Sequence, residues 1–235
     1  MSDKPKPIQI VDAIQAQDAK HAGPELARQL EQQQQYLDNL PPDTEPAERA
    51  RAQLDVAQTL NALRRFDEAH ELAQQAFSLA IGEEAWNEAA LACNTLYKAD
   101  RDDAITALGN GLWLAVAFPI EPTVTVELLH HVIEETPDNS DGAAVAAATA
   151  HYVADLRAKQ HEHANLTFLT SQKLAEVARQ HRGIDGQEAL DTWAEEMELK
   201  DPQTFIPRMS KIVDIIVDDN WWYDRDALRA RLPVN

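Results

Sequence analysis

Apolar residues recur at three- and four-residue spacing along much of the chain, as expected for helices with one buried face. The pattern is clearest from Ala50 onward, where Val56, Leu60 and Leu63 follow one another along a single predicted face. Alanine, leucine, glutamate and glutamine are abundant, whereas only 7 of the 235 residues are glycine. Because the abundant residues lose little side-chain freedom in a helix, we predict an all-α fold.

Proline and glycine residues divide the chain into a series of predicted helices. Residues 1–7 are predicted to be disordered and 8–20 to form a short helix. A second helix is predicted to begin after Gly23, with Pro24 in its first turn, and to end at Leu40 before a proline-rich break. The later predicted helices are 50–63, 68–79, 124–135, 143–158, 163–181, 187–199 and 225–231.

The segment Ile212–Val217 is ambiguous in its local pattern. It is rich in β-branched residues, which favour a strand. A lone strand needs a partner strand, however, and no other segment of the chain predicts one. We therefore prefer a helix for this segment.

Two helical hairpins, offset by 35 residues, are predicted between residues 50 and 119. The offset places Val56 on Leu91 and Ala76 on Gly111, so apolar and small residues recur at matching positions. Small residues are needed where two antiparallel helices approach closely. Because one hairpin cannot bury its apolar face alone, this pattern predicts hairpins that stack on one another.

These two units resemble the tetratricopeptide repeat (TPR) family. Both units lack the family's aromatic residue near the start of the first helix, and Ile81 and Val116 stand where the family has proline. The resemblance covers residues 50–119 and implies stacked antiparallel hairpins, a TPR-like solenoid, with a C-terminal helical extension. The matching residues are Leu60, Phe66, Asp67, Glu68, Ala69 and Ala76 in the first unit, and Leu91, Ala92, Asp102, Asp103, Ala104 and Gly111 in the second.

The breaks and the repeat suggest three regions. Residues 1–22 form an N-terminal tail with a short helix, 23–137 the TPR-like region, and 138–235 a C-terminal helical region. The number of repeats after Pro122 is left open by the pattern.

The chain is strongly acidic, with a formal net charge of −19 at pH 7 that is spread over its length. Such a surface repels nucleic-acid phosphates and anionic lipid headgroups, so we expect neither nucleic acid nor a membrane as partner. The longest apolar run, 112–120, is too short to span a bilayer. A single cysteine, Cys93, and the lack of an apolar leader segment favour a cytoplasmic protein, which we take to be bacterial.

The TPR resemblance implies that the first helix of each unit contributes to a concave face that binds a peptide of a partner protein. Trp86 and Tyr97 are the preferred anchors because aromatic residues contribute strongly to binding energy at interfaces; alternatively, both pack between helices. The face is expected to present Arg51, Leu54, Gln58, Asn61, Ala62, Trp86, Ala89, Cys93, Leu96 and Tyr97.

Adjacent aromatic residues near the C-terminus form a second candidate surface. Trp221, Trp222 and Tyr223 cannot all face one core from a helix, so at least one is expected to be exposed or to cover another part of the protein. The cluster is either a packed lid or a patch for a partner or a homodimer.

No sequence motif indicates catalysis. The chain has no nucleophile elbow, phosphate-binding loop or dinucleotide fingerprint. Cys93 stands among apolar neighbours and is expected to be a core residue. The preferred prediction is therefore a scaffold or accessory protein that acts in assembly, without enzymatic activity or cofactor.

A metal-binding helical bundle is the main alternative. Glu127 and His130 have the Glu-x-x-His spacing found in di-iron bundles, and Glu134 follows one turn later. His161 and His163 form a second histidine cluster, although two residues apart on a helix point in different directions. A third alternative, an apolar ligand pocket beneath residues 112–114, has no sequence feature in its favour.

Overall fold

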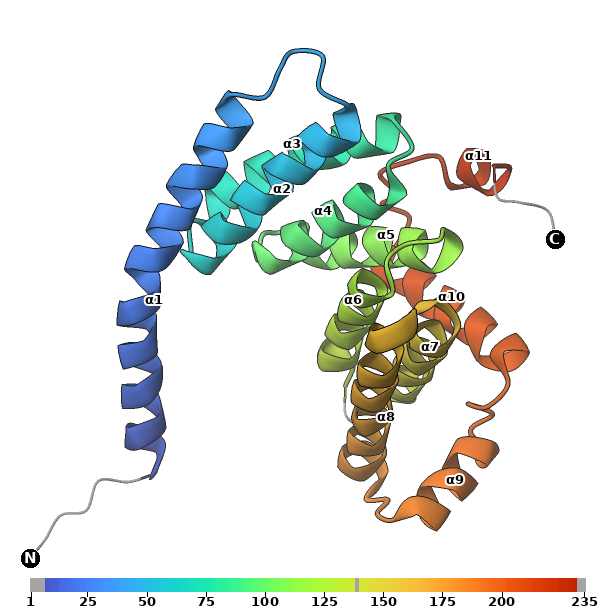
Figure 1. The fold of residues 1–235 in the computed structure, drawn as a ribbon. Helices are drawn as coiled ribbons and strands as arrows, with labels where there is room; N and C mark the ends of the chain where they lie inside the picture. The colour runs from blue at the N-terminus through green and yellow to red at the C-terminus, as the bar shows by residue number, and fades with distance from the viewer. Residues whose placement is uncertain (1–6, 138–139, 232–235) are drawn as a thin grey trace, which may run out of the picture.

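In the computed structural model the described residues, 7–137 and 140–231, form eleven helices and no strand (Figure 1). Side chains are described for these residues except 7–22 and His161. The predicted all-α class is confirmed. The helices are α1 (Pro7–Asp38), α2 (Pro46–Ala62), α3 (Phe66–Gly82), α4 (Trp86–Lys98), α5 (Ala104–Ala117), α6 (Pro122–Glu135), α7 (Gly142–Arg157), α8 (Gln160–Arg182), α9 (Gln187–Glu196), α10 (Pro202–Val217) and α11 (Arg225–Arg229).

The N-terminal part differs from the prediction, because α1 is a single helix that runs through Pro24. A proline removes one backbone hydrogen bond from a helix and costs about 3 kcal/mol, which packing can offset. The part of α1 after Pro24 packs on α2, where Leu30 is buried against Val56 and Leu60. The prediction of disorder concerns residues 1–6, which lie outside the described residues, and Pro7, which begins α1.

The ambiguous segment Ile212–Val217 is helical, as preferred, and ends α10. The residues that decide this are Phe205, Met209, Val213 and Val217, which recur every four positions and are all buried. This spacing places them on one face of a helix, which packs across α5 and α7. The β-branched composition is therefore overridden by the helical spacing of the buried positions.

Consecutive helices pack on each other from α1 to α8. The contacts are most extensive in three pairs: α2 with α3, α4 with α5, and α6 with α7. In addition, α2 contacts α4, and α4 contacts α6. The C-terminal part returns along the molecule, because α10 lies against α5 and α7 while α9 forms the corner that leads into it (Figure 1). The helices thus pack consecutively, and α10 adds contacts with helices that precede it by several elements.

One hydrophobic core extends from α2 to α11 and is rich in alanine. On α7 every residue from Ala143 to Ala150 is buried, since this helix is surrounded by α6, α8 and α10. Position 137, where a region boundary is predicted, lies between α6 and α7, and both helices belong to this core. A separate small cluster joins α1 to α2 and α3.

Glycine is required where α5 meets its neighbours. A Cβ atom built at Gly111 would lie 2.5 Å from Cβ of Cys93 on α4. A Cβ atom at Gly109 would lie 2.5 Å from a side-chain carbon of Val217 on α10. Cys93 is fully buried, as expected of a core residue. The small residue expected at position 111 therefore marks a close approach of two helices.

Replacing Gly111 by alanine is expected to lower the free energy of unfolding by about 1–3 kcal/mol, because the added methyl group overlaps Cys93. Urea unfolding followed by circular dichroism measures the change. Gly82→Ala is the matched control: no atom lies within 4 Å of its added Cβ. We expect the control to be neutral or stabilising by up to about 1 kcal/mol. Equal losses in both variants would contradict the close approach at Gly111.

No helix in the described part of the chain is both long enough and apolar enough to cross a membrane.

Candidate functional site

The residues predicted to form a binding face on α2 and α4 are divided between surface and core. Arg51 and Gln58 are exposed on α2. Asn61 is half-buried and donates a hydrogen bond from Nδ2 to the carbonyl oxygen of Thr95 at 2.9 Å, which joins α2 to α4. Ala62 is exposed, but for four other apolar members of the face the expectation of presentation to a partner is wrong, because helix packing buries them. The fully buried members are Leu54, Ala89, Cys93 and Leu96.

Both predicted aromatic anchors have partners within the chain. Trp86 is half-buried and stacks on Phe118, with ring centroids 4.2 Å apart. The hydroxyl of Tyr97 donates to Oε1 of Glu135 at 2.7 Å, and its ring lies 4.5 Å from that of His131. Burial and the Glu135 carboxylate raise the pKa of Tyr97. Both rings thus serve helix packing, and their role as anchors stays a prediction.

The C-terminal aromatic residues fold back onto α3 and α5. Trp222 meets Phe77 edge-to-face at 5.3 Å between centroids, and Trp221 lies 6.2 Å from Trp113. The side chain of Asn110 accepts a hydrogen bond from the backbone N–H of Trp222 at 3.1 Å. All three aromatics are half-buried, so the segment forms a packed cover over α5.

The residues considered as metal ligands are engaged in separate pairs. Glu127 pairs with Lys98, His130 lies 3.3 Å from Glu134, and His163 lies 3.0 Å from Asp155. Among the described side chains, no three of His, Cys, Asp and Glu come together closely enough to hold a metal ion. The side chain of His161 lies outside the described residues. The two histidine clusters are therefore not joined into one site by the described residues.

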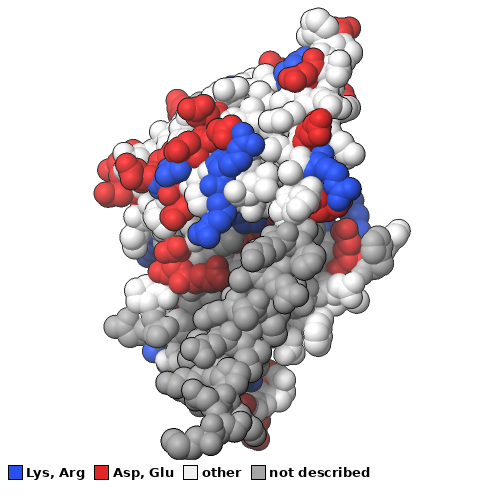
Figure 2. Space-filling view, turned by 90° about the vertical axis from the view of Figure 1, so that its left-hand side faces the viewer, with Lys and Arg blue, Asp and Glu red and all other residues white. Residues whose placement is uncertain are grey.

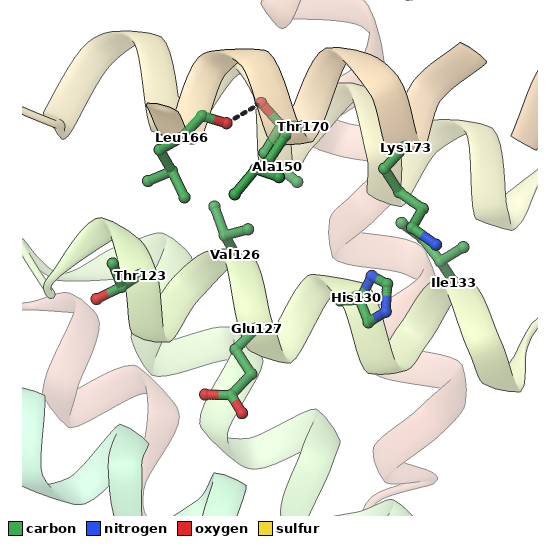
Figure 3. Close-up of a pocket in the computed structure, with 10 residues that line it drawn as sticks. Thr123, Val126, Glu127, His130, Ile133, Ala150, Leu166, Thr170 and Lys173 are labelled. Carbon is green, nitrogen blue, oxygen red and sulfur yellow. Dashed lines mark hydrogen bonds between the residues drawn. The ribbon is translucent and has the colours of Figure 1, made fainter. Parts of the chain in front are cut away.

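An apolar groove of about 320 Å³ lies between α6 and α8, and we treat it as the candidate functional site. Ala150 of α7 is part of its lining (Figure 3). Val126 of α6 and Leu166 of α8 point toward each other across the groove, whereas Glu127 points away from it (Figure 3). The lining residues are Thr123, Val126, Glu127, His130, Ile133, Ala150, Leu166, Leu169, Thr170 and Lys173.

The groove exists because α6 and α8 each pack along α7 but make few contacts with each other. Val126, His130 and Ile133 recur at helical spacing on α6, so one face of that helix is turned to the groove. The only side chain between the helices that belongs to α7 is the small Ala150. Because the Ala150 side chain is shorter than those on α6 and α8, it leaves a hollow between these two helices.

Polar groups in the groove are satisfied locally. The hydroxyl of Thr170 donates to the carbonyl oxygen of Leu166 at 2.8 Å, drawn as a dashed line in Figure 3. A ring nitrogen of His151 lies 3.0 Å from the same hydroxyl oxygen. Nζ of Lys173 forms an ion pair with Glu176 at 2.8 Å. The surface that remains is apolar and is suited to apolar side chains of a ligand.

Two large apolar side chains on α8 are exposed, and one of them, Leu169, lines the groove. Phe168 is 62% exposed and Leu169 is 60% exposed. From His163 to Ala175 the helix contains no acidic residue, and Lys173 is its one Lys or Arg. In a chain with 40 acidic residues among 235, this 13-residue stretch is depleted of charge, as the centres of protein interfaces are. This acid-free stretch is the feature of the sequence that indicates the groove, and it matches no catalytic or metal-binding motif.

The rest of the surface has a different character. Figure 2 shows the face that carries α1, where Asp and Glu side chains form patches with Lys and Arg side chains between them. Acidic residues are thus abundant on this face, whereas α8 carries none from His163 to Ala175.

His131 lies at the contact between α4 and α6, beside the groove. Nδ1 is 3.4 Å from Glu134, and Nε2 is buried without a hydrogen-bond partner among the described residues. Burial lowers the pKa of His131 below its ordinary value of 6.5, and the opposing effect of Glu134 is smaller. The neutral ring is therefore the form that this contact accommodates.

Acidification is expected to weaken the fold through His131. Because its pKa is lowered in the folded state, the unfolded chain binds the proton more readily as pH falls past about 6.5. The free energy of unfolding should thus decrease between pH 7.5 and 5.5, more steeply in the unaltered protein than in His131→Gln. Urea unfolding at several pH values measures both slopes. Parallel slopes would show that His131 makes no contribution.

Comparisons with models of protein families, with curated proteins and with solved structures find no match to this chain.

Proposed function

We propose that this protein is a non-catalytic scaffold or accessory protein that holds a segment of a partner protein in the groove between α6 and α8. The observation that carries the proposal is the apolar groove whose lining includes the exposed large side chain of Leu169, on a charge-depleted helix. Exposed apolar surface of this kind marks interaction sites in proteins that are otherwise polar outside.

The size and lining of the groove favour side chains of a protein segment. Its volume of about 320 Å³ is at the low end of the range for small-molecule pockets, which is roughly 300–1,000 Å³. The polar groups of Thr170 and Lys173 in its lining are already bonded within the chain, so few groups are left to orient a polar ligand. Apolar side chains at helical spacing can enter such a groove as anchors.

We further propose that α2 to α7 form TPR-like helical repeats. The 35-residue offset in the sequence, together with the contacts of α2 with α4 and of α4 with α6, supports this. The turns after α2 and α4 are also alike, since the second residue after each helix, Arg64 or Asp100, has a positive φ angle, of 61° or 52°. A left-handed residue at both positions gives the two hairpins similar turns.

The state of the single cysteine argues against one class of catalysis, by a thiol nucleophile. Cys93 is fully buried, and burial raises the pKa of its thiol. A nucleophilic cysteine requires the opposite, an accessible thiol with a lowered pKa. Cys93 also lies where α4 closely approaches α5 at Gly111, as expected of a core residue.

Leu169→Gln is expected to reduce retention of the partner by more than about tenfold, because truncating or polarising an anchor costs about 2 kcal/mol or more. The protein would be expressed at native level in its own cells, isolated by affinity tag, and the companion quantified by mass spectrometry. Leu156→Gln is the matched control, since Leu156 is 63% exposed on α7 and does not line the groove. Both residues are exposed, so neither change should alter the fold.

A companion retained equally by Leu169→Gln, Leu166→Gln and Leu156→Gln would place binding elsewhere on the protein. Circular dichroism of each variant would verify that loss of the companion does not follow from loss of helicity.

A further inference from the structure

The groove-facing stripe of α8 has carboxylates at both of its ends. Glu162, Leu166, Leu169, Lys173 and Glu176 are separated by four, three, four and three residues, so they lie along one face of the helix. Glu162 and Glu176 bound the acid-free stretch described above, and Leu166 and Leu169 occupy its middle. The stripe therefore combines an apolar centre with acidic ends.

The opposite wall adds carboxylates at its edge. Glu134 on α6 is exposed and lies one turn beyond His130, with which it pairs at 3.3 Å. Glu127 points away from the groove and pairs with Lys98 of α4 (Figure 3). Glu127 and Glu176 are paired with Lys98 and Lys173, whereas Glu134 faces only histidine. At the Glu162 end, Glu121, Arg157 and Lys159 line the neighbouring hollow. Five carboxylates thus stand against four Lys and Arg residues, so the margin is slightly acidic while the centre is apolar.

The geometry points to a basic amphipathic helix as the occupant of this groove, and we propose that the partner segment is one. This inference rests on the proposed function and names the class of partner. Apolar side chains at helical spacing would enter the hollow between Val126 and Leu166, and Lys or Arg side chains on the flanks would meet Glu134, Glu162 and Glu176. Opposite charges at the rim of an interface increase the association rate and fix orientation.

The length of the stripe sets the length of the segment. From Glu162 to Glu176 the helix rises about 21 Å, at roughly 1.5 Å per residue. A partner helix lying along it needs about 14 residues, or four turns, to place basic residues near both ends. On α8 the two apolar residues of the stripe, Leu166 and Leu169, lie within its central two turns.

A second copy of this chain fits the groove less well. It can offer Phe168 and Leu169, but its α8 between Glu162 and Glu176 carries only Lys173 as a base. Each copy also has a net charge of −19, so association brings two acidic molecules together. The negative charge that opposes self-association attracts a basic segment.

The test is a selection from an unbiased library of random 16-residue peptides displayed on messenger RNA. Peptides are selected on the full-length protein and depleted on the Leu169→Gln variant, with Leu156→Gln as the control that should retain binding. We expect the enriched peptides to have apolar residues at i, i+3, i+4 and i+7 and an excess of Lys and Arg between them. Their helicity on binding is measured by circular dichroism.

The charge requirement is tested with one enriched peptide, labelled with fluorescein and titrated by anisotropy. Glu162→Gln with Glu176→Gln should weaken binding by about 2- to 10-fold at low salt, since each exposed ion pair contributes little on its own. The effect should shrink as salt is raised. Glu71→Gln with Glu83→Gln is the matched control and should leave the affinity unchanged, since Glu71 is an exposed acid on α3 and Glu83 is the exposed acid that caps its C-terminal end.

Three results would overturn the inference. The library may yield no peptide that distinguishes the protein from Leu169→Gln, or the enriched peptides may be acidic or lack helical spacing. Alternatively, sedimentation may show a dimer of the protein that is lost in Leu169→Gln and kept in Leu156→Gln, which would make a second copy the occupant. If the cellular companion still depends on Leu169 in the first two cases, the proposed function stands and only the class of partner is wrong.

Discussion

The close approach of helices through alanine and glycine is the constraint on which the rest of this structure depends. α7 is buried along its alanine-rich length between α6, α8 and α10. Gly109 and Gly111 let α5 meet α10 on one side and α4 on the other. Interiors are packed so densely that one added methyl group at such contacts forces helices apart. The positions of these small residues therefore decide which helices can touch.

The groove is a consequence of that packing. α6 and α8 both lie against α7, and longer side chains such as Val126 and Leu166 face each other across Ala150. The same small side chain that allows close packing on α7 leaves the space between its two neighbours unfilled. At another place the molecule covers apolar surface itself, where Trp221 packs on Trp113 of α5 and Trp222 on Phe77 of α3. The surface of α8 has no such cover within the described residues.

In the proposed function, charge contributes to the specificity of this uncovered surface. A net charge of −19 opposes the close approach of two copies and of other acidic molecules. On α8 the acidic residues stop at Glu162 and resume at Glu176, so an apolar ligand can lie between them without burying a carboxylate. Burying an unpaired charge is costly, which explains why a neutral stretch is suited to be the centre of an interface.

The sequence by itself determined the all-α class, because helical spacing of buried residues such as Phe205, Met209, Val213 and Val217 is a local property that outweighs β-branched composition. It also indicated the close contact at Gly111 through the 35-residue offset. Only the tertiary structure decided that α1 continues through Pro24, that Leu54 and Leu96 are buried, and that Trp86 stacks on Phe118. The groove likewise depends on residues from α6, α7 and α8, and periodicity within one helix shows which face is apolar but not which neighbour covers it.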